Sequence, residues 1–101
     1  TQRSCDAPTG LPFNIASYSL LTCMLAQITG LTPKTLTINI GDAHIYENQV
    51  EGVHEQLTRT PLGAPTLWLN PNIKNIFDFK MKDVKLMGYQ SHPKITFPMN
   101  V

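Results

Sequence analysis

Residues 11–30 read LPFNIASYSLLTCMLAQITG, and this segment sets the architecture of the chain. Its apolar residues would surround an α-helix on most sides rather than form one stripe. Pro12 falls in the expected first turn, where proline is tolerated, and Gly30 is suited to end the helix. A helix that is apolar nearly all round lies in the middle of a protein. We therefore expect residues 11–30 to form a long, buried, central helix, which 101 residues offer little to bury fully, so partner structure is expected to be missing.

The rest of the chain predicts strands and one shorter helix. Residues 36–40 alternate apolar and polar side chains, as in a strand with one face on a core. Residues 47–59 predict an amphipathic helix, residues 66–69 and 84–87 predict short strands, and the end of the chain predicts an extended tail. The side chains expected on the inner face of the amphipathic helix are Val50, Val53 and Leu57. This pattern indicates an α+β fold with a mixed sheet rather than a regular βαβ wind.

Length and charge exclude several classes of partner. The 101 residues, 42% of them apolar, fit one small globular domain. Eight Lys and Arg residues and seven Asp and Glu residues give a formal charge of +1 and are scattered along the chain. No stripe could neutralise a run of phosphates, so we expect no DNA or RNA partner. No run of about 18 uninterrupted apolar residues and no leader like a signal peptide is present, so we expect no membrane partner.

The two cysteines, Cys5 and Cys23, lack the spacing of a metal site or of a CxxC pair. Cys23 lies within the apolar run, where a buried reduced thiol is expected. These features favour a cytoplasmic location and no bound metal. The chain also enters a dense polar cluster directly after Thr1. Because the termini of domains tend to fray, we expect a truncated start.

Arg3 and Ser4, in the segment QRSCD at residues 2–6, form a natural phosphate clamp. A guanidinium group forks onto phosphate oxygens, and a neighbouring hydroxyl adds a further donor. A solvated surface arginine is the alternative, and it is the commoner role of an Arg-Ser pair. The pair alone therefore does not decide between the two.

Other polar side chains stand at positions where a ligand could bind. Asn14, near the start of the expected helix, offers one donor and one acceptor together, which suits the edge of a pyrimidine ring. A capping or internally satisfied asparagine is the alternative. Asp42, His44 and Tyr46 continue the parity of the core-facing strand residues, unless Gly41 adds a bulge. Polar side chains there need either a ligand or a satisfied structural network, and both readings fit.

Four segments, in this order, resemble the thymidylate synthase family: QRSCD at residues 2–6, GLPFNIASY at 10–18, GDAHIY at 41–46 and GYQSHP at 88–93. The likeness spans essentially the whole chain, and the first two segments are its most specific part. Members of the family are considerably longer than this chain. The resemblance therefore implies that residues 1–101 are the C-terminal part of a single thymidylate synthase catalytic domain, with its α+β fold.

This resemblance implies a methyltransferase that converts dUMP to dTMP. In the family, 5,10-methylenetetrahydrofolate is the co-substrate that gives both the one-carbon unit and a hydride. The enzyme works as a homodimer and needs no metal. These 101 residues would supply groups that bind the nucleotide and the folate.

The resemblance also assigns the binding residues. Arg3 and Ser4 match the residues that bind the nucleotide phosphate, and Asn14 matches the residue that pairs with N3 and O4 of uracil. His44 and Tyr46 match the residues that hold the 3′-hydroxyl of the deoxyribose.

The folate side of the site is assigned in the same way. Asp6 matches the residue that contacts the pterin, and Gly10 and Phe13 match residues that line the folate site. Val101 matches the C-terminal residue that closes over the ligands and excludes water.

No residue of this chain is assigned a catalytic role. The family's nucleophile is a Cys in a Pro-Cys motif before the QRS segment, and Cys5 and Cys23 match other positions. The arginine pair that reaches the phosphate across the dimer also precedes that segment. We therefore expect the missing N-terminal region of the same enzyme to complete the site. The alternatives are a dUMP hydroxymethylase of the same fold and a non-catalytic fragment that binds nucleotide or forms dimers.

Overall fold

The structure is a computed structural model that describes residues 1–100, so Val101 and its expected role in closure lie outside the described residues. The helices and strands, in chain order, are β1 (Gln2–Asp6), α1 (Ala7–Thr29), β2 (Ile40–His44), α2 (Val50–Leu57), β3 (Thr66–Leu69) and β4 (Val84–Met87). Short 3₁₀ turns occur at Glu47–Gln49, Ile76–Asp78 and Met81–Asp83.

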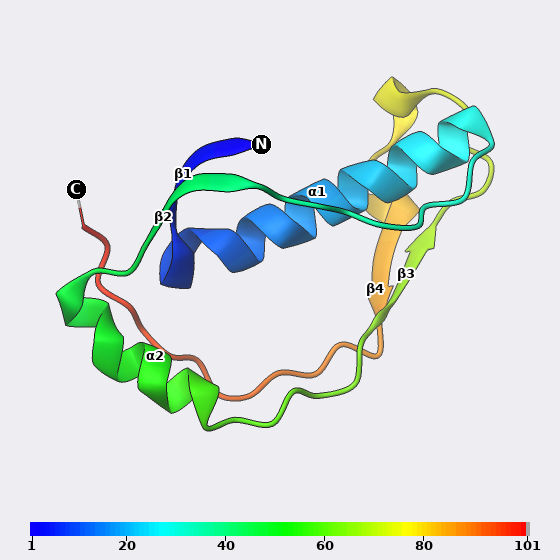
Figure 1. Ribbon diagram of the computed structural model, residues 1–101. Helices are drawn as coiled ribbons and strands as arrows, with labels where there is room; N and C mark the ends of the chain where they lie inside the picture. Colours follow the sequence, from blue (N-terminus) through cyan, green and yellow to red (C-terminus); the bar gives the residue numbers. More distant parts are fainter. Residues whose placement is uncertain (101) are drawn as a thin grey trace.

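The strands form two pairs near the two ends of α1. β1 pairs with β2 in parallel, and β3 pairs with β4 in an antiparallel hairpin. Figure 1 shows α1 running between the pairs, with α2 and the C-terminal tail set apart from it. The expected α+β class is confirmed, and so are the strands predicted at residues 66–69 and 84–87. Within residues 1–100 the two pairs are not joined into one sheet.

Both ends of α1 are fixed by local capping. The helix begins at Ala7, earlier than expected, because the Asp6 side chain caps it by accepting a hydrogen bond from the backbone N–H of Thr9 (3.4 Å). Pro8 therefore occupies the first turn, and Pro12 lies inside the helix rather than in its first turn. Gly30 ends the helix as predicted, with the left-handed φ of 71° that glycine adopts at little cost.

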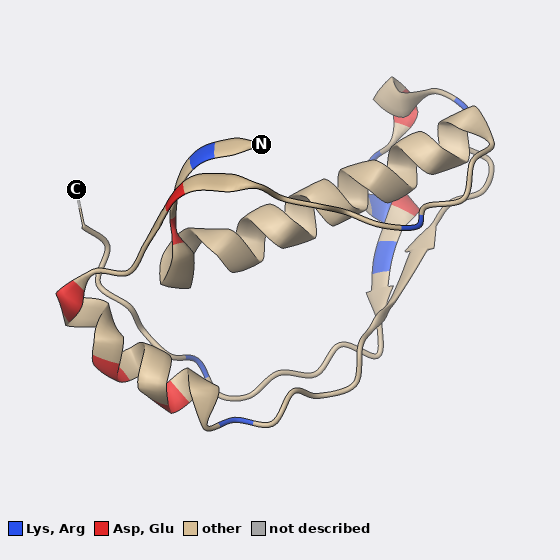
Figure 2. Cartoon of the chain, in the orientation of Figure 1, with Lys and Arg blue, Asp and Glu red and all other residues tan. Residues whose placement is uncertain are grey.

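The described residues bury little of α1, as the length of the chain leads one to expect. The helix contains no charged residue, and Figure 2 shows its ribbon free of charge from Ala7 to Thr29. Only Ala26 is buried, and Phe13 is 73% exposed. The radius of gyration is 16.2 Å, whereas a compact chain of this length has about 13 Å. These residues form an open arrangement with almost no core of their own.

The strand expected at residues 36–40 is only partly present. β2 begins at Ile40, and residues 31–39 have no regular element. The position of β1 sets where β2 begins, because the β1–β2 register starts with Gln2 opposite Ile40. The backbone N–H of Gln2 donates to the carbonyl of Asn39 (2.7 Å). Before that point no neighbouring strand is available, and an alternating pattern alone does not make a ladder.

The helix expected at residues 47–59 is shorter and less buried than predicted. It starts with the 3₁₀ turn Glu47–Gln49, and α2 then ends at Leu57. Leu57 is 76% exposed and Val50 is also exposed, so only Val53 of the expected inner face is half-buried. The prediction of a packed inner face is wrong for the described residues, because the chain beside α2 is a tail and not a sheet.

The C-terminal tail runs extended along α2, as Figure 1 shows. The Nη1 of Arg59 donates to the carbonyl of Pro93 (2.6 Å). A Cβ placed on Gly52 would lie 2.6 Å from the ring of Phe97, so helix and tail are in direct contact. The predicted extended tail is confirmed for residues 90–100.

By length and composition alone α1 could cross a membrane, since an 18-residue window within it has a mean hydropathy of 1.3. The core helix of a water-soluble protein meets the same criterion. A polar contact ties this helix to the rest of the chain, because Gln27 Nε2 donates to the carbonyls of Asn70 (2.9 Å) and Ile73 (3.1 Å). This contact fits a helix that packs within a protein.

Substitution of Gly41 is expected to separate β1 from β2. A Cβ at Gly41 would lie 2.9 Å from the carbonyl oxygen of Arg3, and this backbone atom cannot rotate away. Gly41→Ala should therefore lower the free energy of unfolding by about 1–3 kcal/mol, as measured by urea denaturation. Gly63→Ala is the matched control, because nothing lies within 4 Å of a Cβ there. Equal losses in the two variants would contradict the close contact.

Candidate functional site

Parallel pairing of β1 and β2 brings polar side chains to one edge. The register places Ser4 opposite Asp42 and Asp6 opposite His44. Because the carboxyl ends of parallel strands meet at the same edge, Asp6 and His44 lie together although they are far apart in the sequence. Gly41 does not shift the register, so the parity expected from the sequence is kept.

The first turns of α1 start from the same edge. α1 begins directly after β1, which places Gly10 and Asn14 beside the strand. A Cβ on Gly10 would lie 3.7 Å from both the Oδ1 of Asn14 and the Sγ of Cys5. The absence of a side chain at Gly10 therefore leaves room around the Asn14 amide.

Asn14 is half-buried and tied to β1. The Nε2 of Gln2 donates to the Oδ1 of Asn14 (3.0 Å) and to the carbonyl of Ser4 (3.0 Å). Within residues 1–100 the Nδ2 of Asn14 donates no hydrogen bond, and the Oε1 of Gln2 is buried without a partner. A buried polar atom without a partner is costly. One donor and one acceptor on neighbouring side chains are thus left for a ligand or for further chain.

His44 and Tyr46 form a second pair of polar groups at this edge. Their rings pack edge to face, with centroids 5.2 Å apart and an interplanar angle of 84°. The Nδ1 of His44 lies 3.2 Å from the carbonyl oxygen of Asp42, to which it can donate. In the neutral imidazole this bond leaves Nε2 as an acceptor. The exposed Tyr46 hydroxyl adds a donor and an acceptor, so the pair can bind a hydroxyl group.

Asp6 accepts hydrogen bonds from more than the helix that it caps. Both of its oxygens lie 3.2 Å from the Nε2 of Gln49, which follows β2 in the 3₁₀ turn. Burial alone would raise the pKa of the Asp6 carboxyl, but the hydrogen bonds from Gln49 and Thr9 outweigh it and hold the pKa below its ordinary value. Asp6 is therefore an anionic acceptor at neutral pH.

Other predicted site residues stand open to solvent. Arg3 and Phe13 are exposed, and the Arg3 guanidinium makes no ion pair within the part of the chain that the structure describes. A free guanidinium beside Ser4 on β1 can bind an anion. The structure thus brings Ser4, Asp6, Gly10, Asn14 and His44 toward one edge, which we call the polar edge. Arg3 and Phe13 lie beside it.

Two residues were missed by the sequence analysis. Gln2 belongs to the quoted QRSCD segment but received no role, although it fixes Asn14. Gln49 lies in a segment predicted only as an amphipathic helix, yet it is fully buried. An isolated polar residue in such a helix gives no signal in the sequence, so only the fold identifies it.

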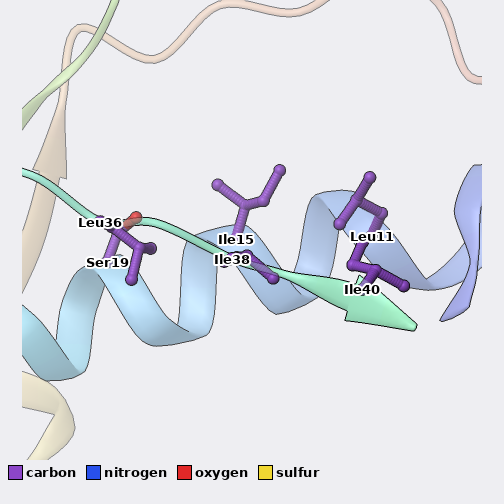
Figure 3. Close-up of a pocket in the computed structure, with 6 residues that line it drawn as sticks. All are labelled: Leu11, Ile15, Ser19, Leu36, Ile38 and Ile40. Carbon is purple, nitrogen blue, oxygen red and sulfur yellow. The ribbon is translucent and has the colours of Figure 1, made fainter. Parts of the chain in front are cut away.

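An apolar groove lies outside this edge. It has a volume of about 450 Å³ between α1 and the segment that leads into β2, and Figure 3 shows the side chains that line it. These are Leu11, Ile15, Ser19, Leu36, Ile38 and Ile40. One hydroxyl among five aliphatic side chains suits packing against apolar groups rather than a phosphate or a base edge. The groove explains the alternation of residues 36–40, whose apolar members face α1.

No group of three His, Cys, Asp or Glu side chains could hold a metal ion among residues 1–100. Cys5 is buried and Cys23 is half-buried, and both are free thiols.

Known proteins are similar to this chain in sequence and in fold. A sequence model described as thymidylate synthase matches residues 1–101. The thymidylate synthase of Malacoplasma penetrans (strain HF-2) is 61% identical over 94 residues, which are 93% of this chain and 32% of that protein. The solved structure of thermostable thymidylate synthase A from Bacillus subtilis matches with a TM-score of 0.92 and 38% identity.

The match to the Bacillus subtilis structure covers 96% of this chain and 35% of that chain, so this chain spans about a third of the length of these relatives. The agreement extends over β1, α1 and β2, where the polar edge lies, because almost the whole chain is covered. By sequence and by fold, the chain belongs to the thymidylate synthase family.

Proposed function

We propose that this chain is part of a cytoplasmic thymidylate synthase that methylates dUMP to dTMP with 5,10-methylenetetrahydrofolate. One observation carries the proposal: five of the residues that family resemblance assigns to nucleotide and folate come together at one edge of the β1–β2 pair, although they belong to three separate elements. They are Ser4, Asp6, Gly10, Asn14 and His44. Strand pairing and the cap of α1 produce this convergence. A chance scatter of polar residues would not share an edge.

The nucleotide would lie along this edge from β1 to β2. Arg3 and Ser4 would bind its phosphate, since a guanidinium and a hydroxyl are adjacent on β1 and Arg3 is exposed. The Nδ2 of Asn14, which donates no hydrogen bond within residues 1–100, would donate to a carbonyl of uracil. His44 and Tyr46 would hold the 3′-hydroxyl between them, in keeping with their 5.2 Å ring separation.

The folate would bind at the start of α1. The Asp6 carboxylate would accept hydrogen bonds from the N–H groups of the pterin, and the exposed ring of Phe13 would offer an apolar surface. Gly10 would leave space between them. The C-terminal tail, including Val101, would then close over both ligands and exclude water, which protects reactive intermediates.

The nucleophile would come from the rest of the enzyme. Cys5 on β1 is 5% exposed and its Sγ lies 3.7 Å from the Oδ1 of Asn14 on α1, so its thiol is not available to attack a substrate. Completion of the site would require the remaining part of the same enzyme and, in a homodimer, the second subunit. We therefore expect the 101-residue chain alone to lack turnover.

A chimera tests the proposal most directly. Residues 1–101 would replace the matched portion of the Malacoplasma penetrans enzyme, to which the chain is 61% identical over 94 residues. We expect this chimera to convert dUMP to dTMP with methylenetetrahydrofolate, as measured by mass spectrometry of the product. A product heavier by one oxygen would instead indicate hydroxymethylation. Binding of dUMP without any product would support a non-catalytic role and contradict the proposal.

Asn14 is expected to set the preference for uracil over cytosine. Cytosine has an amino donor where uracil has the O4 carbonyl that the Nδ2 of Asn14 would bind, and a site built to hydrogen-bond one substrate group rejects an analogue lacking it by about 10⁴-fold or more. In the chimera, Asn14→Ala should lower kcat/KM for dUMP by about 10- to 100-fold, from the loss of buried hydrogen bonds, and should change that for dCMP little. Asn72→Ala, in an exposed turn, is the control. An unchanged ratio of the two substrates would place the uracil edge elsewhere.

Arg3 is expected to act on the phosphate alone. Arg3→Ala in the chimera should raise the dissociation constant of dUMP by about 10-fold or more, because a charge-assisted hydrogen bond contributes about 1.5–3 kcal/mol. The affinity for deoxyuridine, which lacks the phosphate, should stay the same. Isothermal titration measures both, with Lys34→Ala as a control for loss of an exposed positive charge. Equal weakening of both ligands would argue against phosphate contact.

A further inference from the structure

Gln49 is a buried polar residue that joins three parts of the chain. It is 0% exposed and is the largest fully buried side chain among the described residues. Its Oε1 accepts a hydrogen bond from the backbone N–H of Tyr46 (2.9 Å). Its Nε2 donates to both oxygens of Asp6 (3.2 Å each) and to the carbonyl of Pro98 in the tail (3.1 Å).

The amide of Gln49 satisfies all of these groups at once. Two N–H groups meet the carboxylate and the tail carbonyl, and one oxygen meets the backbone N–H of Tyr46. No other side chain of this length would do so: glutamate would repel Asp6 and lack a donor for Pro98, and methionine would leave every partner unpaired. A buried amide with each group used is strongly restricted in orientation.

We propose that Gln49 is a positioning residue that couples the seating of the C-terminal tail to the orientation of Asp6 and Tyr46. The Gln49 amide can donate to the Pro98 carbonyl only while its other N–H donates to Asp6 and its oxygen accepts from the backbone N–H of Tyr46. Conversely, a seated tail fixes the amide against the carboxylate. The ligands of Asp6 and Tyr46, folate and ribose, rest on the proposed function, but the coupling itself rests on the four contacts.

The test uses the chimera with Gln49→Met, which keeps the side-chain length and removes its polarity. The KM for methylenetetrahydrofolate should rise about 10-fold or more, because a hydrogen bond to a charged group is lost. The KM for dUMP should rise less, about 2- to 5-fold, because the Tyr46 N–H is neutral. Trimming of the tail by carboxypeptidase should be about 10-fold faster, since the Pro98 contact is lost. Gln56→Met, at an exposed position of α2, should change none of these.

A double-mutant cycle separates positioning from simple loss of packing. In the Asp6→Ala background, Gln49→Met should change the folate KM by less than about 2-fold, because contacts that act as a unit are not additive. Additive effects would overturn the proposal. If Gln49→Met does not fold, Gln49→Asn keeps the amide but is too short to reach all its partners, and the same changes are expected of it.

Failure of this inference differs from failure of the proposed function. An active chimera in which Gln49→Met keeps the original folate KM and the original rate of tail trimming would overturn the role of Gln49 alone. An inactive unsubstituted chimera would contradict the proposed function. The trimming rates would still decide whether Gln49 holds the tail, because they do not need turnover.

Discussion

The Asp6 carboxylate is the contact on which the other features of the described structure depend. It ends β1, caps α1 through Thr9, lies opposite His44 in the strand register and accepts two contacts from Gln49. An anion at a helix N-terminus is stabilised by the unpaired N–H groups and by the helix dipole. Hydrogen bonds from Gln49 and Thr9 hold the pKa of Asp6 low, and the one from Thr9 also fixes where the helix starts. Position and charge of this group are therefore set together.

The uncharged surface of α1 is left largely uncovered in the open arrangement of the described residues. This helix has 23 residues and no charged side chain. Wherever its apolar groups stay in contact with water, the favourable free energy of burying them is not gained. The described residues cover little of it, and the groove between α1 and the segment before β2 remains lined by aliphatic groups. Relatives three times as long have more chain to place there. In such a protein, α1 can lie within the core and support the polar edge at its N-terminal end.

The sequence predicted the elements whose signals are local. The all-round apolar pattern and Gly30 located α1, and the short runs at residues 66–69 and 84–87 located β3 and β4. The start of β2 was misplaced because it depends on where β1 begins, which is a tertiary fact. The roles proposed for Arg3, Asn14 and His44 came from resemblance to a family and not from physical pattern. Gln49 was missed because its burial depends on the tail, which contacts it from the far end of the chain.

The polar edge and the tail differ in how firmly they are held. Ser4, Asp6 and His44 stand on paired strands, so their positions follow from a backbone ladder. The tail is held by side-chain contacts instead: Arg59 and Gln49 donate to the carbonyls of Pro93 and Pro98, the side-chain amides of Asn48 and Asn100 pair, and the Phe97 ring lies against Gly52. Proline has a backbone carbonyl but no N–H. The tail can therefore accept hydrogen bonds at Pro93 and Pro98 without pairing as a strand. A segment held in this way can be released and seated again while the edge stays formed. This arrangement fits the proposed function, in which a nucleotide would bind to preformed groups and closure would follow.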